Sequence, residues 1–376
     1  MHRFTPVFYQ SNVRVKSCLT RNVTYPYLYI SIQQVTYFLG GIKMKFMLSI
    51  LAALALFAMP AKAEEYSWKP DKPVTIIVPW SAGGSTDSVT RVLAAELEAA
   101  LGQTVIIVNQ PGAAGSVGTT NAWQADHDGL TWAAGAAIDA GAYQVLGMLD
   151  VPIDDWRLYL HIANVAVVGA NPDSGYKDFG DVLAAMKANP GDVSVATAGV
   201  TSGGHNAMEA IAQATGGKYK HVSYDGGKPA VLAAVSGETK ITTQLASEQT
   251  EMIRAGRLVP LAVLADQPLV IEGYGEIPSI KQWIPEIKTA NNYFGIWAPA
   301  DVPDNVIETM DAVWTNVISK SKALSDYAAD RGAILDPSSG DAAQAAVKPA
   351  LTQNVFLLFD GGKTKTDSTK YGFTRP

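Results

Sequence analysis

Cysteine is almost absent from this chain of 376 residues, which holds a single one, Cys18, close to its start. One cysteine excludes a disulfide framework within the chain. Residues 64–376 contain none, which also excludes thiol chemistry and a lipid-anchored cysteine at residue 64 for that part.

Acidic residues are missing from the first 63 residues. Residues 1–43 are rich in Tyr and Thr, and we interpret them as a non-native N-terminal extension; a longer native leader is the alternative. From Met44 a basic residue, an apolar run (Phe46 to Met59) and Ala61-Lys62-Ala63 follow in the order of a secretory signal peptide. The run is short for a membrane span. We therefore predict a signal peptide over residues 44–63 and a freely soluble exported protein.

Positive charge is scarce in what remains. Residues 1–63 hold seven of the 29 Lys and Arg and none of the 35 Asp and Glu, so residues 64–376 have 22 basic and 35 acidic residues and a formal net charge of −13. Such a chain is a poor partner for nucleic acid or anionic lipid. Its length exceeds one comfortable hydrophobic core, which predicts two lobes.

The most informative stretch runs from Lys72 to Leu101. Val74–Val78 is typical of a buried strand, and residues 81–84 form a turn of small residues. The helix that follows is expected to be capped by Ser85 or Thr86 and to end at Gly102. Uncommitted backbone N–H groups at such a helix start, together with the helix dipole, can bind an anion. An ordinary strand–helix turn is the alternative.

The same arrangement recurs at residues 193–215, where a strand, a turn of small residues and a helix follow one another. Strands alternating with helices at this interval predict parallel sheets built from βαβ units. Two helix starts that face each other across a cleft could hold both ends of a small dianion.

Three other motifs favour different functions. Gly112, Gly115 and Gly118 have the spacing G-x-x-G-x-x-G, which departs from the dinucleotide-binding pattern, so a tight turn is the plainer interpretation. Residues 199–203 have the outline of a hydrolase nucleophile elbow with Thr201 in the serine position, but His205 is too near on the same helix. His127 lies in an Asp-rich loop without a second ligand cluster, which favours a solvated turn over a metal site.

Several segments together resemble the Bug family, the periplasmic solute-binding receptors of tripartite tricarboxylate transporters. They occur in the family's order and spacing between about Lys72 and Arg331: PWSAGGSTD, VIIVNQPGAAGSVG, Gly191-Asp192-Val193, TSGGHNAMEAIAQATG, HVSYDGGKPA, AGRL and FGIWAPADVP. The ordered series, rather than any one motif, makes the resemblance specific.

The resemblance implies an α/β fold of two doubly wound, Rossmann-like lobes with a ligand cleft between them, of the type II periplasmic binding protein kind. Lobe 1 would comprise residues 64–165 and 288–376, and lobe 2 residues 166–287. The implied function is capture of a small organic carboxylate, or a related amide or amino acid, in the periplasm and its delivery to the transporter's membrane subunits. No catalysis and no cofactor are expected, and the receptor is expected to be a monomer. Presentation of the ligand to a sensor kinase and an exported hydrolase are the alternatives.

Carried over position by position, the family pattern implies ligand-binding residues in four loops. They are Trp80, Ser81, Gly84, Ser85, Thr86 and Asp87 in the first; Ala136 and Ala137 after the third strand; Thr197, Thr201, Ser202 and His205; and Tyr224 with Asp225. Backbone N–H groups and hydroxyls would donate to carboxylate oxygens, and Asp87 would orient its loop.

The chain departs from the family pattern at Asp225, where such receptors usually carry Lys or Arg, and at Ala136 and Ala137, where they offer hydroxyls. Both changes remove support for an anionic group. We therefore expect a ligand with one carboxylate and a neutral or cationic far end; Asp225 pointing to solvent is the alternative.

Exported protein is expected to begin at Glu64, because Ala61-Lys62-Ala63 is the one small-x-small site after the apolar run. N-terminal sequencing of the mature protein checks this, and residues from 1–43 in the product would contradict it.

Overall fold

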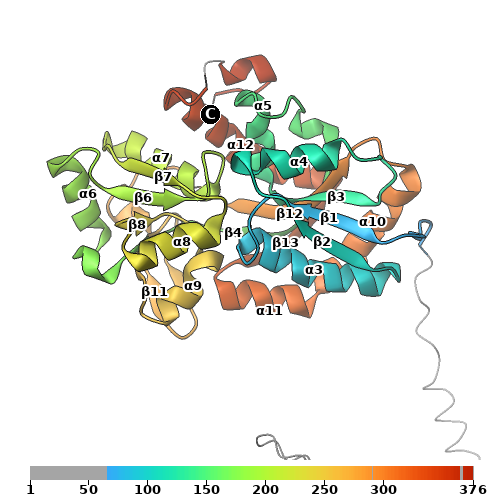
Figure 1. Ribbon diagram of the computed structural model, residues 1–376, viewed down its shortest axis with the longest axis horizontal. Helices are drawn as coiled ribbons and strands as arrows, with labels where there is room; N and C mark the ends of the chain where they lie inside the picture. The colour runs from blue at the N-terminus through green and yellow to red at the C-terminus, as the bar shows by residue number, and fades with distance from the viewer. Residues whose placement is uncertain (1–65, 290, 365–366, 376) are drawn as a thin grey trace, which may run out of the picture. The chain divides into compact units, whose positions relative to one another are not determined.

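The computed structural model describes residues 66–289, 291–364 and 367–375, so the predicted extension and signal peptide lie outside the described residues. The described chain forms two α/β lobes, each built around its own sheet (Figure 1). None of the described helices combines the length and the apolar character needed to cross a bilayer.

The first lobe contains a six-stranded sheet with the order β13-β4-β12-β3-β1-β2. Its strands are β1 (Val74–Val78), β2 (Val105–Asn109), β3 (Thr131–Ala136), β4 (Trp156–Asn164), β12 (Asn292–Pro299) and β13 (Ile334–Ser339). Its helices are α3 (Ser85–Leu101), α4 (Ser116–Trp123), α5 (Ala137–Val145), α10 (Asp304–Asn316), α11 (Lys322–Arg331) and α12 (Gly340–Asp360). The core joins β-branched strand residues such as Ile76 to an aromatic group in which Tyr159 contacts Trp132 and Trp314.

The second lobe contains a five-stranded sheet with the order β7-β6-β8-β5-β9 and a separate hairpin. Its strands are β5 (Val167–Ala170), β6 (Ser194–Thr197), β7 (Lys220–Ser223), β8 (Ile241–Thr242) and β9 (Val259–Val263), and the hairpin is β10 (Leu269–Ile271) with β11 (Gly275–Ile277). Its helices are α6 (Phe179–Ala188), α7 (Gly203–Thr215), α8 (Gly227–Ser236) and α9 (Ala246–Arg254). Phe179, Val195, Met208 and Ile241 are fully buried in its core.

Both sheets are mixed, so the prediction of wholly parallel sheets was wrong. β1 pairs in parallel with β2 and β3, whereas β12 is antiparallel to β3 and β4. In the second sheet β6 is parallel to β7 and β8, whereas β5 is antiparallel to β8 and β9. The reason is the path of the chain: β5 and β12 each enter a lobe from the other lobe. Each of these two strands therefore starts at the boundary between the lobes and runs away from it, opposite to the strands that end there.

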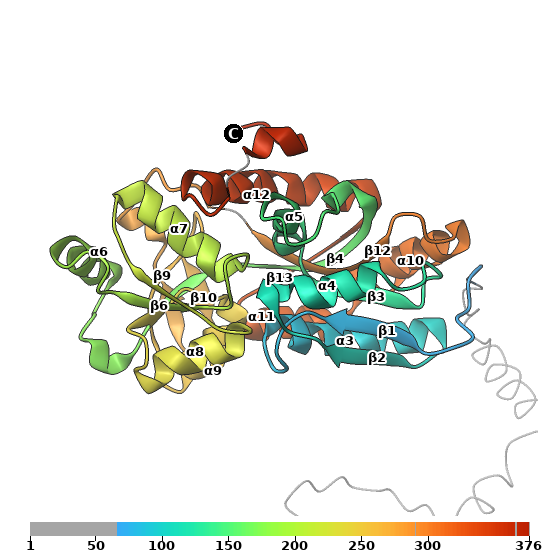
Figure 2. The ribbon, with the colours of Figure 1, turned by 45° about the horizontal axis from the view of Figure 1, so that its top comes forward.

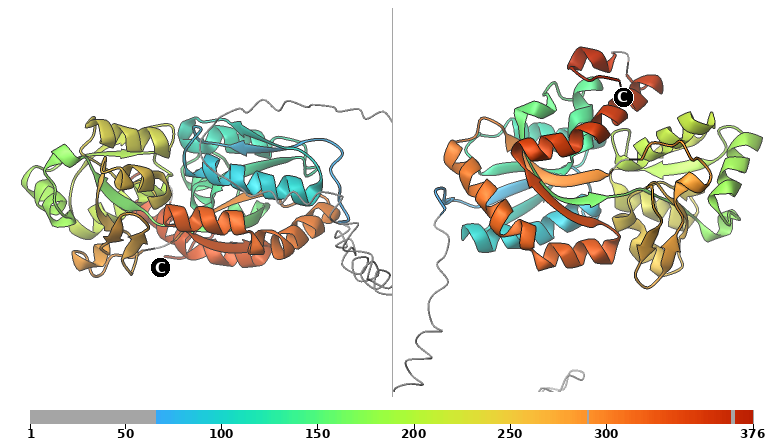
Figure 3. Two further views of the ribbon diagram at one scale, coloured as in Figure 1. Left: turned by 90° about the horizontal axis from the view of Figure 1, so that it is seen from below. Right: turned by 180° about the vertical axis from the view of Figure 1, so that it is seen from behind.

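Two segments connect the lobes directly. Only Val165 and Ala166 separate β4 from β5, and β12 brings the chain back. Helix α12 packs on α5 of the first lobe and on α7 of the second, as Figures 2 and 3 show from different sides. The carboxyl ends of β1, β3 and β6 consequently lie along the boundary between the lobes, the edge at which open α/β sheets bind ligands.

One local prediction was wrong. The N-cap of α3 is Gly84 and makes no side-chain capping bond, so neither Ser85 nor Thr86 caps the helix. Elsewhere in this lobe, helix α10 ends at Asn316 and gives way to a 3₁₀ turn. Helix α5 begins at Ala137, directly after β3.

Gly118 and Gly295 permit close backbone packing. A Cβ at Gly118 would lie 2.8 Å from the carbonyl oxygen of Gln110, which supports the interpretation of this glycine as a contact between helix and strand. At Gly295 the pairing of β12 with β4 shifts register, and a Cβ there would collide with the carbonyl oxygen of Tyr159.

Gly295→Ala is expected to destabilise the protein by about 1–3 kcal/mol, because a rigid strand carbonyl must move to admit the methyl group. Urea denaturation followed by tryptophan fluorescence measures the change in the free energy of unfolding. An unchanged midpoint and slope would contradict the close approach of β12 to β4.

Candidate functional site

A small cavity lies between the lobes at the carboxyl ends of the strands. The first lobe contributes Trp80, Gly84, Ser85, Thr86, Ala136, Asp139, Asn292 and Phe294, and the second Ala198, Ser202, Gly203, Gly227, Gln244, Leu245 and Glu248. Its volume of about 20 Å³ has room for roughly one water molecule. The lobes are therefore closed on each other in this structure.

The loop after β1 is shaped by its own side chains. Gly83 has φ +82°, and its N–H donates to Asp87 Oδ2 over 2.8 Å. Arg91 Nη2 pairs with Asp87 Oδ1 at 2.8 Å, one turn further along α3. Although burial opposes ionisation, the bonds from Arg91 and Gly83 hold the pKa of Asp87 below its usual value. Asp87 thus orders the loop, the role expected for it.

The amino terminus of α3 receives an anion from the chain itself. Glu248, in the first turn of α9 on the other lobe, accepts the N–H of Ser85 at Oε1 (3.2 Å) and the N–H of Leu245 at Oε2 (3.3 Å). The amide of Gln244, oriented to satisfy both of its ends, donates to Glu248 Oε2 over 2.9 Å. Beside this contact the hydroxyls of Ser85 and Ser247 lie 2.6 Å apart. The sequence predicted an anion site here, and in this structure Glu248 occupies it.

A second carboxyl group, that of Asp139, lines the same cavity. It belongs to the first turn of α5, is 5% exposed, and its Oδ1 has no hydrogen-bond partner among the described residues. Burial raises the pKa of Asp139 well above its usual value, and the charge of Glu248 raises it further. Burial also raises the pKa of Glu248 to about 7, although the Ser85 and Leu245 amides favour its ionised form.

Six of the fourteen predicted site residues line the cavity: Trp80, Gly84, Ser85, Thr86, Ala136 and Ser202. Ser202 caps α7 by accepting the N–H of His205. Gly84 has φ −75°, so its backbone conformation does not require glycine. The direct contact of these residues with a ligand stays a prediction.

The other eight lie around the cavity or away from it. The N–H of Ser81 donates to the carbonyl of Asp225 over 3.1 Å, and the Asp225 residue is exposed. The Tyr224 hydroxyl donates to Glu238. Asp87 orders its loop, and Ala137 is buried at the start of α5. Thr197, Thr201 and His205 have partners within the protein, described next.

Thr201, in the serine position of the elbow-like motif, and His205 are each bonded to other groups and not to one another. Thr201 Oγ1 donates to the carbonyl of Ala114 over 2.9 Å. His205 Nδ1 lies 2.9 Å from the carbonyl oxygen of Val200, and its Nε2 lies 3.3 Å from Glu209. Thr197 Oγ1 lies 2.6 Å from His221 Nε2, and burial lowers the pKa of His221 to about 4.

His127 is bound locally. Its Nδ1 lies 2.6 Å from Asp301 Oδ1. Within the described ranges no group of three or more His, Cys, Asp or Glu is placed to hold a metal ion.

Sequence reasoning missed the polar residues that dominate the cavity: Asp139, Gln244, Glu248 and Asn292. Asp139 and Glu248 each lie in the first turn of a helix that begins soon after a strand, and an acid in that position was the available signal. It was missed at Asp139 because no helix was predicted there, and at Glu248 because no role was assigned to that residue.

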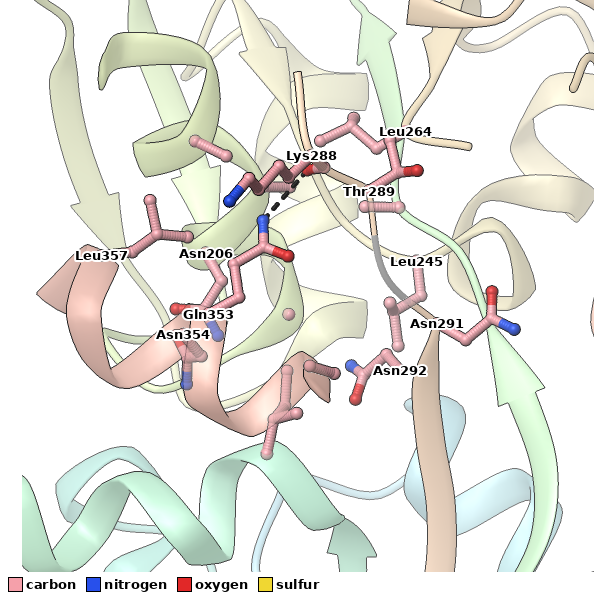
Figure 4. A pocket seen from close by; sticks show the side chains of 16 residues that line it. Asn206, Leu245, Leu264, Lys288, Thr289, Asn291, Asn292, Gln353, Asn354 and Leu357 are labelled. Carbon is pink, nitrogen blue, oxygen red and sulfur yellow. Dashed lines mark hydrogen bonds between the residues drawn. The ribbon is translucent and has the colours of Figure 1, made fainter. Parts of the chain in front are cut away.

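A second pocket adjoins the first and shares Gly203, Leu245 and Asn292 with it. Its volume is about 70 Å³. Figure 4 shows it beside the segment that leads back to the first lobe. The side-chain amides of Asn292 and Asn354 are buried in it without hydrogen-bond partners among the described residues. Gln353 closes one side by donating to the carbonyl of Lys288 over 3.0 Å.

Two α/β lobes that close on a small cavity define a solute-binding protein of the two-lobe class. Residues 89–348 match the model of the tripartite tricarboxylate transporter family receptor, and the chain belongs to that family. The chain is also 29% identical over 294 residues to Protein BugT of Bordetella pertussis, which covers 76% of this chain and 87% of that protein.

Solved structures have the same fold. One described as a periplasmic transporter is 26% identical, with a TM-score of 0.71 over 78% of this chain and 99% of the other. MatC from Rhodopseudomonas palustris, described with bound malate, is 21% identical, with a TM-score of 0.69 over 77% of this chain and 99% of the other. The match to the receptor family confirms the Bug-family assignment made from sequence.

The two acids of the cavity predict how stability depends on pH. Because the pKa of Glu248 is raised from 4.5 to about 7 by folding, the folded state holds a proton that the unfolded state releases within that window. The free energy of unfolding should therefore fall as the pH rises from about 4.5 to about 7, by up to ~3 kcal/mol from Glu248, and Asp139 adds a change of the same sign. Glu248→Gln should remove its share, as measured by urea unfolding across that range.

Two further variants complete the test: the first is a control, and the second disturbs the same buried carboxylate. Glu276→Gln alters an exposed acid and should retain the wild-type pH dependence. A Cβ at Gly227 would collide with the Glu248 carboxylate, so Gly227→Ala should reduce the dependence as Glu248→Gln does. A wild-type pH profile in both Glu248→Gln and Gly227→Ala would show that Glu248 is not buried in the cleft.

Proposed function

We propose that this chain is a periplasmic receptor that captures a small organic carboxylate, or a related amide or amino acid, and delivers it to a tripartite tricarboxylate-type membrane transporter. Membership of the receptor family and the malate described in MatC support the proposal. The receptor would act as a monomer after removal of residues 1–63. Its lobes would comprise residues 64–165 with 288–376, and residues 166–287.

The observation that carries the proposal is the closed cavity whose walls come from both lobes. Hydrogen bonds cross between the lobes around it: Ser85 to Ser247, Ser81 to Asp225, and Thr201 to Ala114. Such contacts break when the lobes separate, which opens the cavity to solvent. A ligand held by both walls favours the closed state through its greater affinity for that state.

A second group of contacts between the lobes joins α9 to α11. Arg254 on α9 pairs with Asp330 on α11 at 2.7 Å, and Arg331 on α11 pairs with Glu251 on α9 at 2.7 Å. These acids are more than half exposed, so each pair contributes little to closure by itself. The ligand and the buried contacts around it would therefore decide between the open and closed states.

We expect the ligand-free protein to have a larger radius of gyration than the protein saturated with a ligand found by calorimetry among malate, succinate, aspartate, nicotinate and nicotinamide. Small-angle X-ray scattering measures this difference, and Asp154→Asn, an exposed change in the first lobe, is the control. Identical radii with and without ligand would point to a rigid cleft.

Ser247→Ala should weaken binding of that ligand about threefold to tenfold, because it removes one contact made only in the closed state.

A further inference from the structure

The cavity between the lobes is lined by two carboxyl groups and by no basic side chain: neither Lys nor Arg is among its fifteen described lining residues. Two other acids of the described chain, Asp87 and Glu209, are also deeply buried, and each has a basic group beside its carboxylate. Asp87 pairs with Arg91, and Glu209 lies near His205 and Lys363. Asp139 is as buried as these two and has no partner at Oδ1. Among the described residues no cationic side chain pairs with Asp139, and a cationic ligand group there would favour its ionised form against the cost of burial.

The Ser85 N–H at the start of α3 already has an acidic acceptor. It donates to Glu248, as do the Leu245 N–H and the Gln244 amide of the second lobe. A ligand carboxylate placed there would have to displace Glu248 or lie against it, and like charges at short range repel strongly in a closed site. The cavity therefore disfavours a second negative group beside Glu248.

Two aromatic side chains of the first lobe line the same cavity. Trp80 and Phe294 are 6% and 3% exposed and lie in its lining together with Asp139 and Glu248. Aromatic rings attract cations and tolerate the apolar carbons beside them. A cavity lined by carboxyl groups and aromatic side chains suits an ammonium group.

A place for one carboxylate remains at the start of helix α7, in the same lobe as Glu248. Helix α7 begins at Gly203, and Ser202 and Gly203 line the cavity. The first N–H groups of a helix have no acceptor within it, and the dipole favours a negative group there. The second lobe thus presents this helix amino terminus as well as Glu248, and the first lobe contributes Asp139.

We infer that the ligand carries a cationic ammonium group that binds between Asp139 and Glu248, and that it is a small amino acid rather than a dicarboxylate. This inference rests on the proposed receptor function and specifies its ligand class. The exposed Asp225, from which the sequence suggested a cationic far end, has no part in it. Asp139 and Glu248 are the specificity-determining residues.

The experiment compares acids that differ only by an amino group: succinate with aspartate, propionate with β-alanine, and butyrate with 4-aminobutyrate. Isothermal titration calorimetry on the mature chain should show at least one amino compound binding tenfold or more tighter than its partner acid. Asp139→Asn and Glu248→Gln should each reduce that preference at least tenfold. The controls Asp154→Asn and Glu276→Gln change exposed acids, one in each lobe, and should leave it unchanged.

Proton exchange gives a second readout that needs no variant. Burial raises the pKa of Glu248 to about 7, so near neutral pH this acid holds a proton in part, and burial raises the pKa of Asp139 as well. The phenols close to them, Tyr143 and Tyr327, remain neutral because burial raises the pKa of each. An ammonium ligand would expel a proton on binding, whereas a carboxylate beside these acids would cause proton uptake. Titrations in phosphate and in Tris, which differ in ionisation enthalpy, give the sign.

The outcomes separate the two proposals. Binding of the acids without preference for the amino compounds, or proton uptake with the amino compound that binds best, overturns the inference and leaves the receptor function standing. Amino-acid binding that Asp139→Asn and Glu248→Gln leave unchanged, with both variants folded by circular dichroism, also overturns it. If no compound binds, the inference and the proposed function for small organic acids both fall.

Discussion

Glu248 reaches from the second lobe to the amino terminus of α3 on the first, and the closed cleft is built around that contact. Its carboxylate accepts N–H groups from both lobes, and the Ser85–Ser247 contact lies beside it. Burying a carboxylate costs free energy that these donors offset in part, which is why its pKa is raised to about 7 despite them. The cavity that remains is small and acidic, and this limits what can enter.

The chain path accounts for the position of that contact. β5 and β12, which enter a lobe from its neighbour, run opposite to β6 and β3, so the carboxyl ends of β1, β3 and β6 face the boundary between the lobes. Helices that follow those strands start there, and the helix starts bring backbone N–H groups to one place. A receptor that must release its ligand needs binding groups on two lobes that can separate, and this topology supplies them.

Local sequence was sufficient where short-range physics dominates. The run Val74–Val78, the small turn and the apolar stripe of α3 were predicted correctly, as were the strand and helix around residues 193–215. Six of the predicted positions line the cavity for the same reason, since they sit in those turns. The predicted helix cap was wrong because α3 begins one residue earlier, after Gly84, and Glu248, 163 residues further along the chain, accepts the Ser85 N–H.

The sequence by itself determined the class of fold, the receptor family and the loops that face the cleft, because periodicity, turn residues and ordered motifs are local properties. Only the tertiary structure decided which side chains fill the cleft. Asp139 and Glu248 are distant in sequence, and their meeting depends on how α5 and α9 approach across the boundary between the lobes. The exposure of Asp225 was decided in the same way, because burial is a property of the packed lobes and not of a loop sequence.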